Sequence, residues 1–517
     1  MTRLTDYTRY ADAHRHYSKQ ALWALFDGDK DALNIAHECV DRHAGRGIEG
    51  DVAIRVAHAD GRDEVITFTE LSAWSGRVAS FLVARGVKPG ERVAMMLEPS
   101  LAFYAALFGA MKMGAVAVPL FTLFGPEGLR LRMDDCSPAL LLLAPEKHEL
   151  AAAAGTEVVI ADERWLAEVA QQPVRAPIAS RADDMALYQY TSGTTRELPE
   201  AVKHRHRAIV TVAIAALYAT GVRPGDRYMC PSSPAWGHGL WHGTLAPLGL
   251  GVSIAAYAGK FDAERLLQAT ADYGITNMSA AATHYRLMKN SGAASRHVYG
   301  LKKLTFTGEP IDSATAEWAA HTFGTPVCSI YGTTEVGVII ANYPGADDLP
   351  VKPGALGKPV PGVEVAVLDR AGLPCAAGVI GEIMLRRGDG WFPTKDLGHL
   401  DEDGYFYHNG RADDVIISAG WTMSAVEIED TLLKHPDVAE CAAIGVPDAT
   451  RGQVVKAYVV SPRAASDAFV SEIQKFAQER LSRHEYPRQV EFVDELPKTP
   501  AGKVNRNALR ARLQEQA

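Results

Sequence analysis

The chain has 517 residues, and its 53 lysines and arginines against 62 aspartates and glutamates give a formal net charge of −9. Apolar residues make up 47% of the chain and charged residues 22%, which is ordinary for a soluble globular protein. This length predicts about three domain-sized units. The acidic balance argues against nucleic acid as a partner, because a surface that neutralises phosphates is usually basic.

The cysteines and the apolar stretches argue against two further classes of protein. The six cysteines form no Cys-x-x-Cys pair, so neither a disulfide framework nor a cysteine zinc site is indicated. Residues 1–17 are polar and carry no apolar signal core, and the longest apolar stretch, 208–218, is too short to cross a bilayer. We therefore expect a cytoplasmic protein with no membrane span.

Up to about residue 340, short apolar runs alternate with longer helical patterns, as is typical of an α/β protein. The clearest unit is a strand over 92–97, a helix over 101–112 and a strand over 114–119. A strand over 186–190 and an apolar helix over 208–218 follow.

The composition changes near residue 350. Between 352 and 407 the chain is rich in glycine and proline and carries short strand patterns, which predicts a small β subdomain. Beyond residue 411 the pattern reads strand, helix, strand, strand, helix, strand, with the helices over 425–434 and 469–481. We predict an α/β fold with a large N-terminal domain of several subdomains over residues 1–411. A small, mobile α+β C-terminal domain over residues 412–517 follows it.

The first chemical signal is a loop rich in serine and threonine between the strand over 186–190 and a helix expected from about residue 207. Hydroxyls and backbone N–H groups beside a glycine can cradle phosphate oxygens, and small side chains allow close approach. An ordinary turn rich in these residues is the structural alternative. The candidate phosphate-binding residues are Thr191, Ser192, Gly193, Thr194 and Thr195.

Five further motifs follow this loop. They are Gly308-Glu309-Pro310, Tyr331-Gly332-Thr333-Thr334-Glu335, the segment 391–396 ending in Asp396, the segment 410–414 containing Arg411 and Asp413, and the segment 497–503 ending in Lys503. In this order the six motifs resemble those of the AMP-forming acyl-CoA synthetases, within the wider group of adenylate-forming ligases. The resemblance covers about residues 30 to 510. Segments 451–456 and 486–488 are most similar to the medium-chain acyl-CoA synthetases.

The resemblance implies a reaction in two halves. A carboxylate attacks the α-phosphate of ATP to give acyl-AMP and pyrophosphate, and the thiol of coenzyme A then attacks the acyl-AMP to give a thioester and AMP. Lys503 would bridge the carboxylate and the α-phosphate, where negative charge gathers. Thr334 would contact the α-phosphate, and Glu335 would bind Mg²⁺. Asp396 would accept the ribose hydroxyls, with Arg411 as a donor beside it.

The other motif residues would complete the nucleotide site and serve the second half-reaction. Gly308, Glu309 and Pro310 would form the turn on the adenine side, and Tyr331, Gly332 and Thr333 the second nucleotide motif. Asp413 matches the hinge about which the C-terminal domain rotates between the half-reactions. Ser418, Gly420 and Trp421 would then approach coenzyme A, where a glycine leaves the backbone bare for pantetheine.

The segment over 234–242 occupies the region that walls the acid site in the resembled enzymes. Trp236, His238, Gly239 and Trp241 are the candidate acid-site residues. His238 and His242 have helical i, i+4 spacing, which could also suit a metal, but no glutamate-containing zinc motif surrounds them. Acetate-specific relatives carry a tryptophan just before residue 331, and its absence here favours a larger acid.

Four positions depart from the family pattern. In the phosphate loop Arg196 and Glu200 replace the usual glycine and lysine, and we hypothesise that Arg196 or Lys203 takes over the β/γ-phosphate role. Lys395 replaces the middle glycine of the usual Thr-Gly-Asp, and Thr422 replaces an arginine that holds the nucleotide in the thioester-forming pose.

The expected function is therefore activation of a short-to-medium-chain or aromatic carboxylic acid by ATP, Mg²⁺ and coenzyme A. One alternative passes the acyl group to a carrier-protein thiol. A second, motivated by the altered phosphate loop, is a non-catalytic homologue that binds nucleotide or acyl-AMP. Retention of Lys503, Glu335 and Asp396 argues against the second alternative. A homodimer is compatible with the resemblance.

Overall fold

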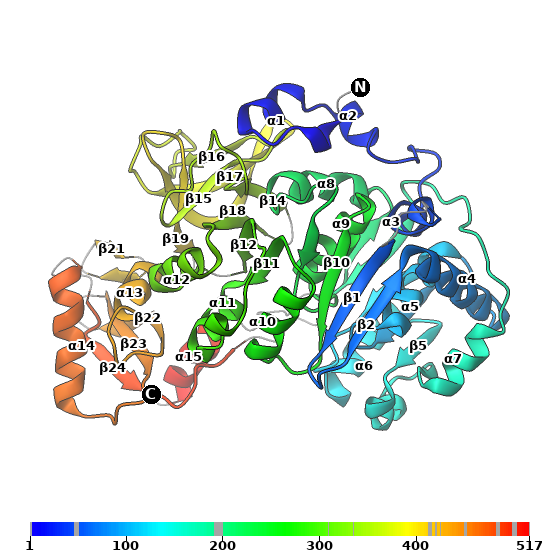
Figure 1. The fold of residues 1–517 in the computed structure, drawn as a ribbon. Helices are drawn as coiled ribbons and strands as arrows, with labels where there is room; N and C mark the ends of the chain where they lie inside the picture. Colours follow the sequence, from blue (N-terminus) through cyan, green and yellow to red (C-terminus); the bar gives the residue numbers. More distant parts are fainter. Residues whose placement is uncertain are drawn as a thin grey trace.

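The computed structural model (Figure 1) describes eleven stretches of the chain. They are residues 3–45, 51–190, 200–308, 310–333, 336–411, 416–418, 421–423, 425–448, 452–481, 486–498 and 504–515.

One sheet belongs to the first part of the chain. Its six strands lie in the order β6 (Glu157–Ile160), β5 (Leu140–Leu143), β3 (Arg92–Met96), β4 (Val116–Pro119), β7 (Met185–Gln189) and β8 (Val202–Arg205). All neighbours are parallel except β7 and β8. The four leucines of β5 are all buried, as expected of a parallel strand covered on both faces.

Helices α4 (Phe68–Ala84) and α5 (Leu101–Lys112) pack together beside this sheet. Gly109 on α5 permits the close approach, because a Cβ there would lie 2.8 Å from the Cβ of Val78 on α4. The same part of the chain also contains α6 (Pro126–Cys136), a 3₁₀ helix (Pro145–Ala153) and α7 (Glu163–Ala170).

The larger sheet has thirteen strands and two halves. Its parallel half runs in the order β13 (Val327–Thr333), β12 (Lys303–Thr307), β11 (Asn277–Ala281), β9 (Arg227–Met229), β10 (Ser253–Ala258) and β1 (Val52–His58), with β2 (Asp63–Thr67) antiparallel at the edge. Its antiparallel half runs from the other edge in the order β16 (Val365–Leu368), β17 (Gly381–Arg387), β18 (Gly390–Leu400), β19 (Phe406–Arg411), β15 (Ala355–Pro359) and β14 (Gly337–Ala341). The predicted β subdomain is thus joined edge to edge to the parallel strands.

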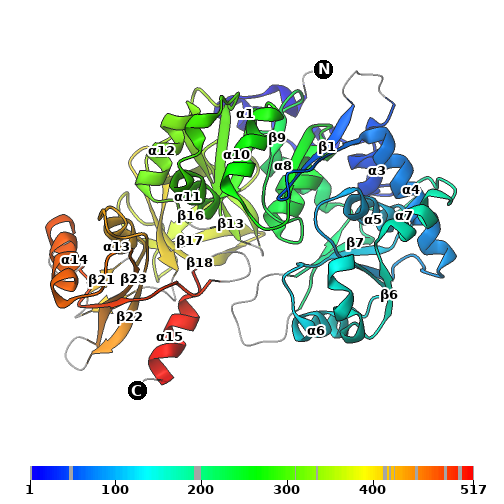
Figure 2. The ribbon, with the colours of Figure 1, turned by 60° about the horizontal axis from the view of Figure 1, so that its bottom comes forward.

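The direction of the strand order reverses at β9. From β9 the chain runs to β10 on one side, and it then returns to β11 on the other side of β9. The carboxyl ends of β9 and β11 therefore flank a topological switch point, the place where ligands bind in open α/β sheets. Helices α10 (Ala263–Asp272), α11 (Ala282–Ser291) and α12 (Ser313–Phe323) lie along this half in both views (Figures 1 and 2).

The C-terminal part of the chain forms its own sheet and core. The three strands are β22 (Glu440–Asp448), β23 (Gly452–Val460) and β24 (Gln489–Phe492), with a hairpin of β20 (Ile416–Ser418) and β21 (Trp421–Met423). Helices α13 (Ala425–Leu432), α14 (Asp467–Arg480) and α15 (Arg506–Glu515) accompany them, at the end of the molecule opposite α7 (Figure 2). The backbone N–H of Ser313 on α12 donates to Asp430 Oδ1 on α13 at 3.2 Å.

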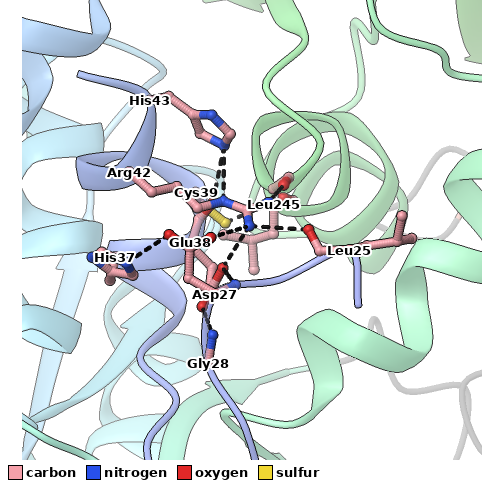
Figure 3. Close-up of polar contacts among 10 residues, drawn as sticks. Leu25, Asp27, Gly28, His37, Glu38, Cys39, Arg42, His43 and Leu245 are labelled. Carbon is pink, nitrogen blue, oxygen red and sulfur yellow. Dashed lines mark hydrogen bonds and ion pairs between the residues drawn. The ribbon is translucent and has the colours of Figure 1, made fainter. Parts of the chain in front are cut away.

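The N-terminal segment carries α1 (Tyr10–His16), α2 (Lys19–Trp23) and α3 (Ile35–Cys39) and is fixed by a buried ion pair (Figure 3). Glu38 is fully buried, and its carboxylate lies 3.0 Å from Arg42 Nη1. The same carboxylate accepts the backbone N–H groups of Asp27 at 3.1 Å and Gly28 at 2.7 Å. Arg42 also donates to the carbonyl of Leu25 at 3.0 Å. The pair therefore closes the loop between α2 and α3.

The same network reaches the centre of the molecule. The Arg42 guanidinium donates to the carbonyl of Gly249 on α9 (Ala246–Gly249), and Cys39 Sγ donates to the carbonyl of Leu245 at 3.3 Å (Figure 3). Leu245 is the last residue of a π-helix, His238–Leu245, that leads into α9. The N-terminal segment thus holds the C-terminal end of an element in which the sequence places candidate acid-site residues.

The structure confirms the predicted helices over 101–112 and 208–218, which are α5 and α8 (Ala208–Tyr218). The helix predicted from about residue 207 after the phosphate loop is α8, but strand β8, which the sequence analysis did not predict, lies before it and pairs antiparallel with β7. Residues of β8 alternate between partly buried and exposed, a two-residue period that is too short to be distinctive in the sequence. The i, i+4 spacing of His238 and His242 was interpreted as that of an α-helix, but the segment is a π-helix.

Candidate active site

Two predicted nucleotide motifs lie at one edge of the parallel half-sheet. Gly308 and Pro310 follow the end of β12, and Tyr331 and Gly332 lie near the end of the neighbouring strand β13. Gly308 has a φ of 96°, in the left-handed region that favours glycine. Gly332 faces β14 so closely that a Cβ would lie 1.9 Å from the carbonyl oxygen of Gly337. The backbone conformation at Gly308 and the close strand contact at Gly332 therefore both favour glycine.

Several predicted residues of these motifs fall outside the described part of the chain. They are Glu309, Thr334 and Glu335, and only the backbone of Thr333 is described, at the end of β13. Their roles remain predictions.

Asp396 brings the second nucleotide motif into contact with the ribose motif. The Tyr331 hydroxyl donates to Asp396 Oδ2 at 2.7 Å, and Asp396 is 5% exposed. Asp396 on β18 is the direct register partner of Arg411 on β19, so these two predicted ribose ligands are neighbours. Three sequence motifs thus meet around one buried carboxylate, although 80 residues separate Tyr331 from Arg411 along the chain.

His408 is a neighbour of Asp396 that the sequence analysis missed. Its Nε2 lies 3.7 Å from Asp396 Oδ1, and its ring centroid lies 6.1 Å from that of Tyr331. A shift in the register of β18 and β19 between Leu397 and Gly398 brings His408 to this face. Strand alternation alone gives no signal for such a contact, because a bulge changes which residues share a face.

Lys395, where the resembled enzymes have glycine, has a φ of 62° and an exposed side chain. A residue with a Cβ costs about 1–2 kcal/mol in this left-handed region. We expect Lys395→Gly to relieve this cost and to raise the free energy of unfolding. The gain should be no more than about 1 kcal/mol, because glycine also adds entropy to the unfolded chain. Denaturant unfolding measures the change, and Lys395→Ala, which keeps the Cβ, should show no gain. Equal effects of both variants would contradict this account.

The phosphate loop, Thr191 to Thr195 with Arg196, lies outside the described residues, but both of its flanks are placed. Gln189 on β7 and Val202 on β8 are register partners, and so are Tyr188 and Lys203. Lys203 is exposed, and its Nζ lies 5.5 Å from the ring centroid of Tyr188. The phosphate role of Lys203 remains a prediction.

The candidate acid-site residues lie on and before the π-helix. A π-helix is rare and occurs mostly at functional sites. The Trp236 and His238 rings pack edge to face, 5.4 Å apart. Gly239 does not line open space, because a Cβ there would lie 2.2 Å from the carbonyl oxygen of Ser233. Its absent side chain lets the π-helix pack against the preceding turn.

Trp241 is 7% exposed and acts as an anchor to the strand before the phosphate loop. Its indole Nε1–H donates to Gln189 Oε1 at 3.0 Å, and the His204 ring packs 4.8 Å from it. Burial lowers the pKa of His204 to about 4, so the ring is neutral near pH 7. The contact links the candidate acid site to the start of the phosphate loop.

Two of the candidate coenzyme A residues, Ser418 and Trp421, lie in the β20–β21 hairpin, where they are register partners. The other predicted residues of the C-terminal part, which are Asp413, Gly420 and Lys503, lie outside the described residues. Their roles remain predictions.

One open groove is lined by none of the residues of these motifs. It has a volume of about 900 Å³ and lies between the β1–β2 hairpin, the start of α5 and the start of α7, lined by residues that include His58, Arg62, Glu64, Ser100 and Asp162. Within the part of the chain that the structure describes, no helix is both long and apolar enough to span a membrane.

The sequence matches the family of AMP-binding enzymes over residues 42–393 and the AMP-binding enzyme C-terminal domain over residues 427–503. It is 30% identical to acetyl-coenzyme A synthetase of Bacillus subtilis (strain 168), with 97% of this chain and 94% of that protein covered. It is 31% identical to 3-hydroxybenzoate–CoA ligase of Aromatoleum sp. (strain CIB), with 93% and 97% covered.

The fold is similar to the crystal structure of the anthranilate CoA ligase AuaEII in complex with anthranoyl-AMP. The TM-score is 0.84 at 26% identity, and 94% of this chain and 99% of that chain are covered. Together with the two family matches, these similarities establish that the chain belongs to the AMP-forming acyl-CoA synthetases and is an AMP-forming acid–CoA ligase.

Proposed function

We propose that this ligase converts a short-to-medium-chain or aromatic carboxylic acid to its CoA thioester through an acyl-AMP, with the predicted site residues in the roles that the resemblance implies. The observation that carries the assignment of roles is the buried Asp396, which accepts the Tyr331 hydroxyl at 2.7 Å and pairs in register with Arg411. Three nucleotide motifs meet there, beside the turn at Gly308.

In the first half-reaction the acid carboxylate displaces pyrophosphate from the α-phosphorus of ATP. No protein nucleophile is required, so the residues position two anions and stabilise the charge on phosphorus. Lys503 bridges the carboxylate and the α-phosphate, and Thr334 donates to the α-phosphate. The loop from Thr191 to Thr195 holds the β- and γ-phosphates, assisted by Arg196 or Lys203.

Glu335 is the proposed ligand of Mg²⁺. In the sequence it is two residues beyond Thr333, where β13 ends, and it belongs to the same motif as Tyr331. Mg²⁺ on ATP takes one or two carboxylates together with phosphate oxygens, so a glutamate in this motif fits the donor chemistry. The ion would neutralise charge on the phosphates.

Asp396 is proposed to accept the two ribose hydroxyls of ATP. Hydrogen bonds to a charged group contribute about 1.5–3 kcal/mol each. Because Asp396→Ala removes the acceptor of both hydroxyls, we expect it to raise the KM for ATP by at least roughly 100-fold and to leave the KM for the acid within about threefold. Tyr331→Phe removes only the donor that positions Asp396 and should have a smaller effect in the same direction. Steady-state kinetics with each substrate varied in turn measures the split, and a larger effect on the acid than on ATP would contradict the role.

In the second half-reaction the thiol of coenzyme A attacks the acyl carbon and releases AMP. We propose that residues 412–517 rotate as a unit on a hinge at Asp413 between the two steps. Ser418, Gly420 and Trp421 then approach the pantetheine. Two features support the division at residue 411: the C-terminal part has a separate sheet and a separate core.

The class of acid follows from the relatives whose names state a substrate. One is named for acetyl-coenzyme A, one for 3-hydroxybenzoate and one for anthranilate. The acyl groups in these names are short or aromatic. Trp236 and His238, with ring surfaces near the switch point, suit an acid of this size.

The test is release of pyrophosphate across a panel of carboxylic acids, with and without coenzyme A. We expect release that requires an acid, and AMP with thioester once coenzyme A is present. Thioester formation that needs a carrier protein instead of coenzyme A would overturn the proposed acceptor. No release with any acid, in the presence of measurable ATP binding, would overturn the proposed function.

A further inference from the structure

A cluster of three histidines lies at the topological switch point of the large sheet. His238 and His242 come from the π-helix that follows β9, and His284 comes from the first turn of α11, which follows β11. The His238 and His242 ring centroids are 6.1 Å apart, and His284 is close enough for a charge on it to repel a proton on His238. Ala281 at the end of β11 is the register partner of Thr307, which precedes Gly308. The cluster therefore adjoins the nucleotide motifs.

His238 is fully engaged by the protein. Its Nδ1 lies 2.9 Å from Ser232 Oγ, and its Nε2 lies 2.8 Å from Ser279 Oγ on β11. It is 4% exposed. Both of its nitrogens are thus satisfied, and the ring braces the π-helix against β11 without a nitrogen left for a ligand.

In both His242 and His284 the Nδ1 atom faces the protein interior. His284 Nδ1 accepts the backbone N–H of Ala281 at 3.3 Å, so the proton of the neutral ring is on Nε2. His242 Nδ1 is buried with no hydrogen-bond partner among the described residues. A buried lone pair is tolerated better than a buried N–H without an acceptor, so the proton of His242 is also on Nε2.

The two Nε2–H groups are the free donors of the cluster. Neither Nε2 has a hydrogen-bond partner among the described residues, and neither of these nitrogens is sealed in the protein. Both residues keep part of their surface accessible, although they lie deep in the molecule. Both nitrogens are therefore available to a ligand.

The cluster carries no charge near pH 7. Burial lowers the pKa of His242 and of His284 to about 4. Burial, reinforced by repulsion from His242 and His284, also lowers the pKa of His238 well below its usual value. Among the described residues, the side chains that hydrogen-bond to the cluster or pack a ring against it are also uncharged: Cys230, Ser232, Trp236, Phe261 and Ser279.

We infer that His242 and His284 are specificity-determining residues that donate to a neutral oxygen at the far end of the acid. The acid that this ligase activates then carries a hydroxyl or carbonyl oxygen distal to its carboxylate. This inference rests on the proposed function, because it places the tail of the activated acid in the cluster.

Two other kinds of acid fit the cluster less well. A plain hydrocarbon tail would leave both donors unpaired, and sites built to bind a substrate hydroxyl reject analogues without it by factors of up to ~10⁴–10⁵. A second carboxylate would be buried where no described side chain that hydrogen-bonds to or packs against the cluster carries a full positive charge, and burial of an unpaired charge is strongly disfavoured.

The experiment measures kcat/KM for matched acids with the full-length ligase, ATP and coenzyme A. The probes are 3-hydroxybenzoate against benzoate, 4-hydroxybutyrate against butyrate, and the dicarboxylates isophthalate and succinate. We expect the wild type to prefer the hydroxylated member of at least one pair by at least about tenfold. A preference for the plain acid in both pairs, or for a dicarboxylate, would overturn the inference and leave the proposed function intact.

Two variants assign the preference to the histidines. His242→Phe and His284→Phe keep a flat ring and remove the donor, so each should lower kcat/KM for the hydroxylated acid by roughly 10- to 100-fold. The plain acid leaves that donor unpaired in the wild type, so it should lose no activity in either variant and serves as the internal control for folding. His242→Gln keeps an N–H donor and should restore most of the loss. Equal losses with both acids in the two phenylalanine variants would overturn the inference. No activity of the wild type with any acid would overturn the proposed function and, with it, the inference.

Discussion

Lys503→Ala is expected to slow acyl-AMP formation by about 10²–10³-fold, which is the usual loss when one donor to a developing anion is removed. The thioester-forming step should remain within a few-fold of the wild type, since the lysine is proposed to act only in the adenylating pose. Pyrophosphate release in the absence of coenzyme A measures the first step. Conversion of chemically prepared acyl-AMP to thioester measures the second.

Lys498, five residues earlier in the same motif, provides a matched control. Its Nζ lies 2.9 Å from Glu440 Oε2, so its ammonium already has a partner within the C-terminal part of the chain. Lys498→Ala should change neither half-reaction by more than about threefold, because exposed ion pairs contribute little. Equal loss in both half-reactions with Lys503→Ala, or a Lys498→Ala variant as slow as Lys503→Ala, would contradict the assigned role.

Arg42→Ala is expected to lower the free energy of unfolding by about 3–5 kcal/mol, because it leaves the fully buried Glu38 without its cation. The variant also loses the contact with Leu25 within the N-terminal segment and the contact with Gly249 that ties this segment to α9. Thermal unfolding under fixed protein concentration measures the loss as a fall in the apparent melting temperature.

The exposed pair of Arg62 and Asp60, 2.8 Å apart, is the control for this effect. Arg62→Ala should change the free energy of unfolding by less than about 1 kcal/mol. Replacing both partners with apolar residues, Glu38→Met with Arg42→Met, should restore part of the loss, because no charge then remains buried. A single Arg42→Ala variant as stable as Arg62→Ala would contradict the structural role of the buried pair.

The strongly periodic parts of the fold could be predicted from the sequence. The helices over 101–112 and 208–218 have the predicted bounds because serine caps the first and long apolar runs define both. Strand β8 could not be predicted, since four residues with a two-residue period carry little signal. The helix α15 (Arg506–Glu515) was also missed: its sequence is mostly polar, with only a few apolar residues to mark a buried face.

The residues of the candidate site could also be predicted only in part. Motif order along the chain indicated the nucleotide residues, and the register of β18 and β19 places Asp396 beside Arg411. The Tyr331–Asp396 contact depends on how distant strands are ordered in the sheet, which no local pattern contains. His284 gave no signal either, because its relation to His238 and His242 arises only when β11 lies beside β9.

The central claim is that this ligase forms acyl-AMP before it forms the thioester. Its most direct test is a single turnover with ATP labelled in the α-phosphate and an acid that supports pyrophosphate release, first without coenzyme A and then with it. We expect labelled acyl-AMP to accumulate to about one equivalent of enzyme, and then to disappear at the rate at which AMP and thioester form. Thioester formation without any acyl-AMP, or acyl-AMP that coenzyme A does not consume, would contradict the account.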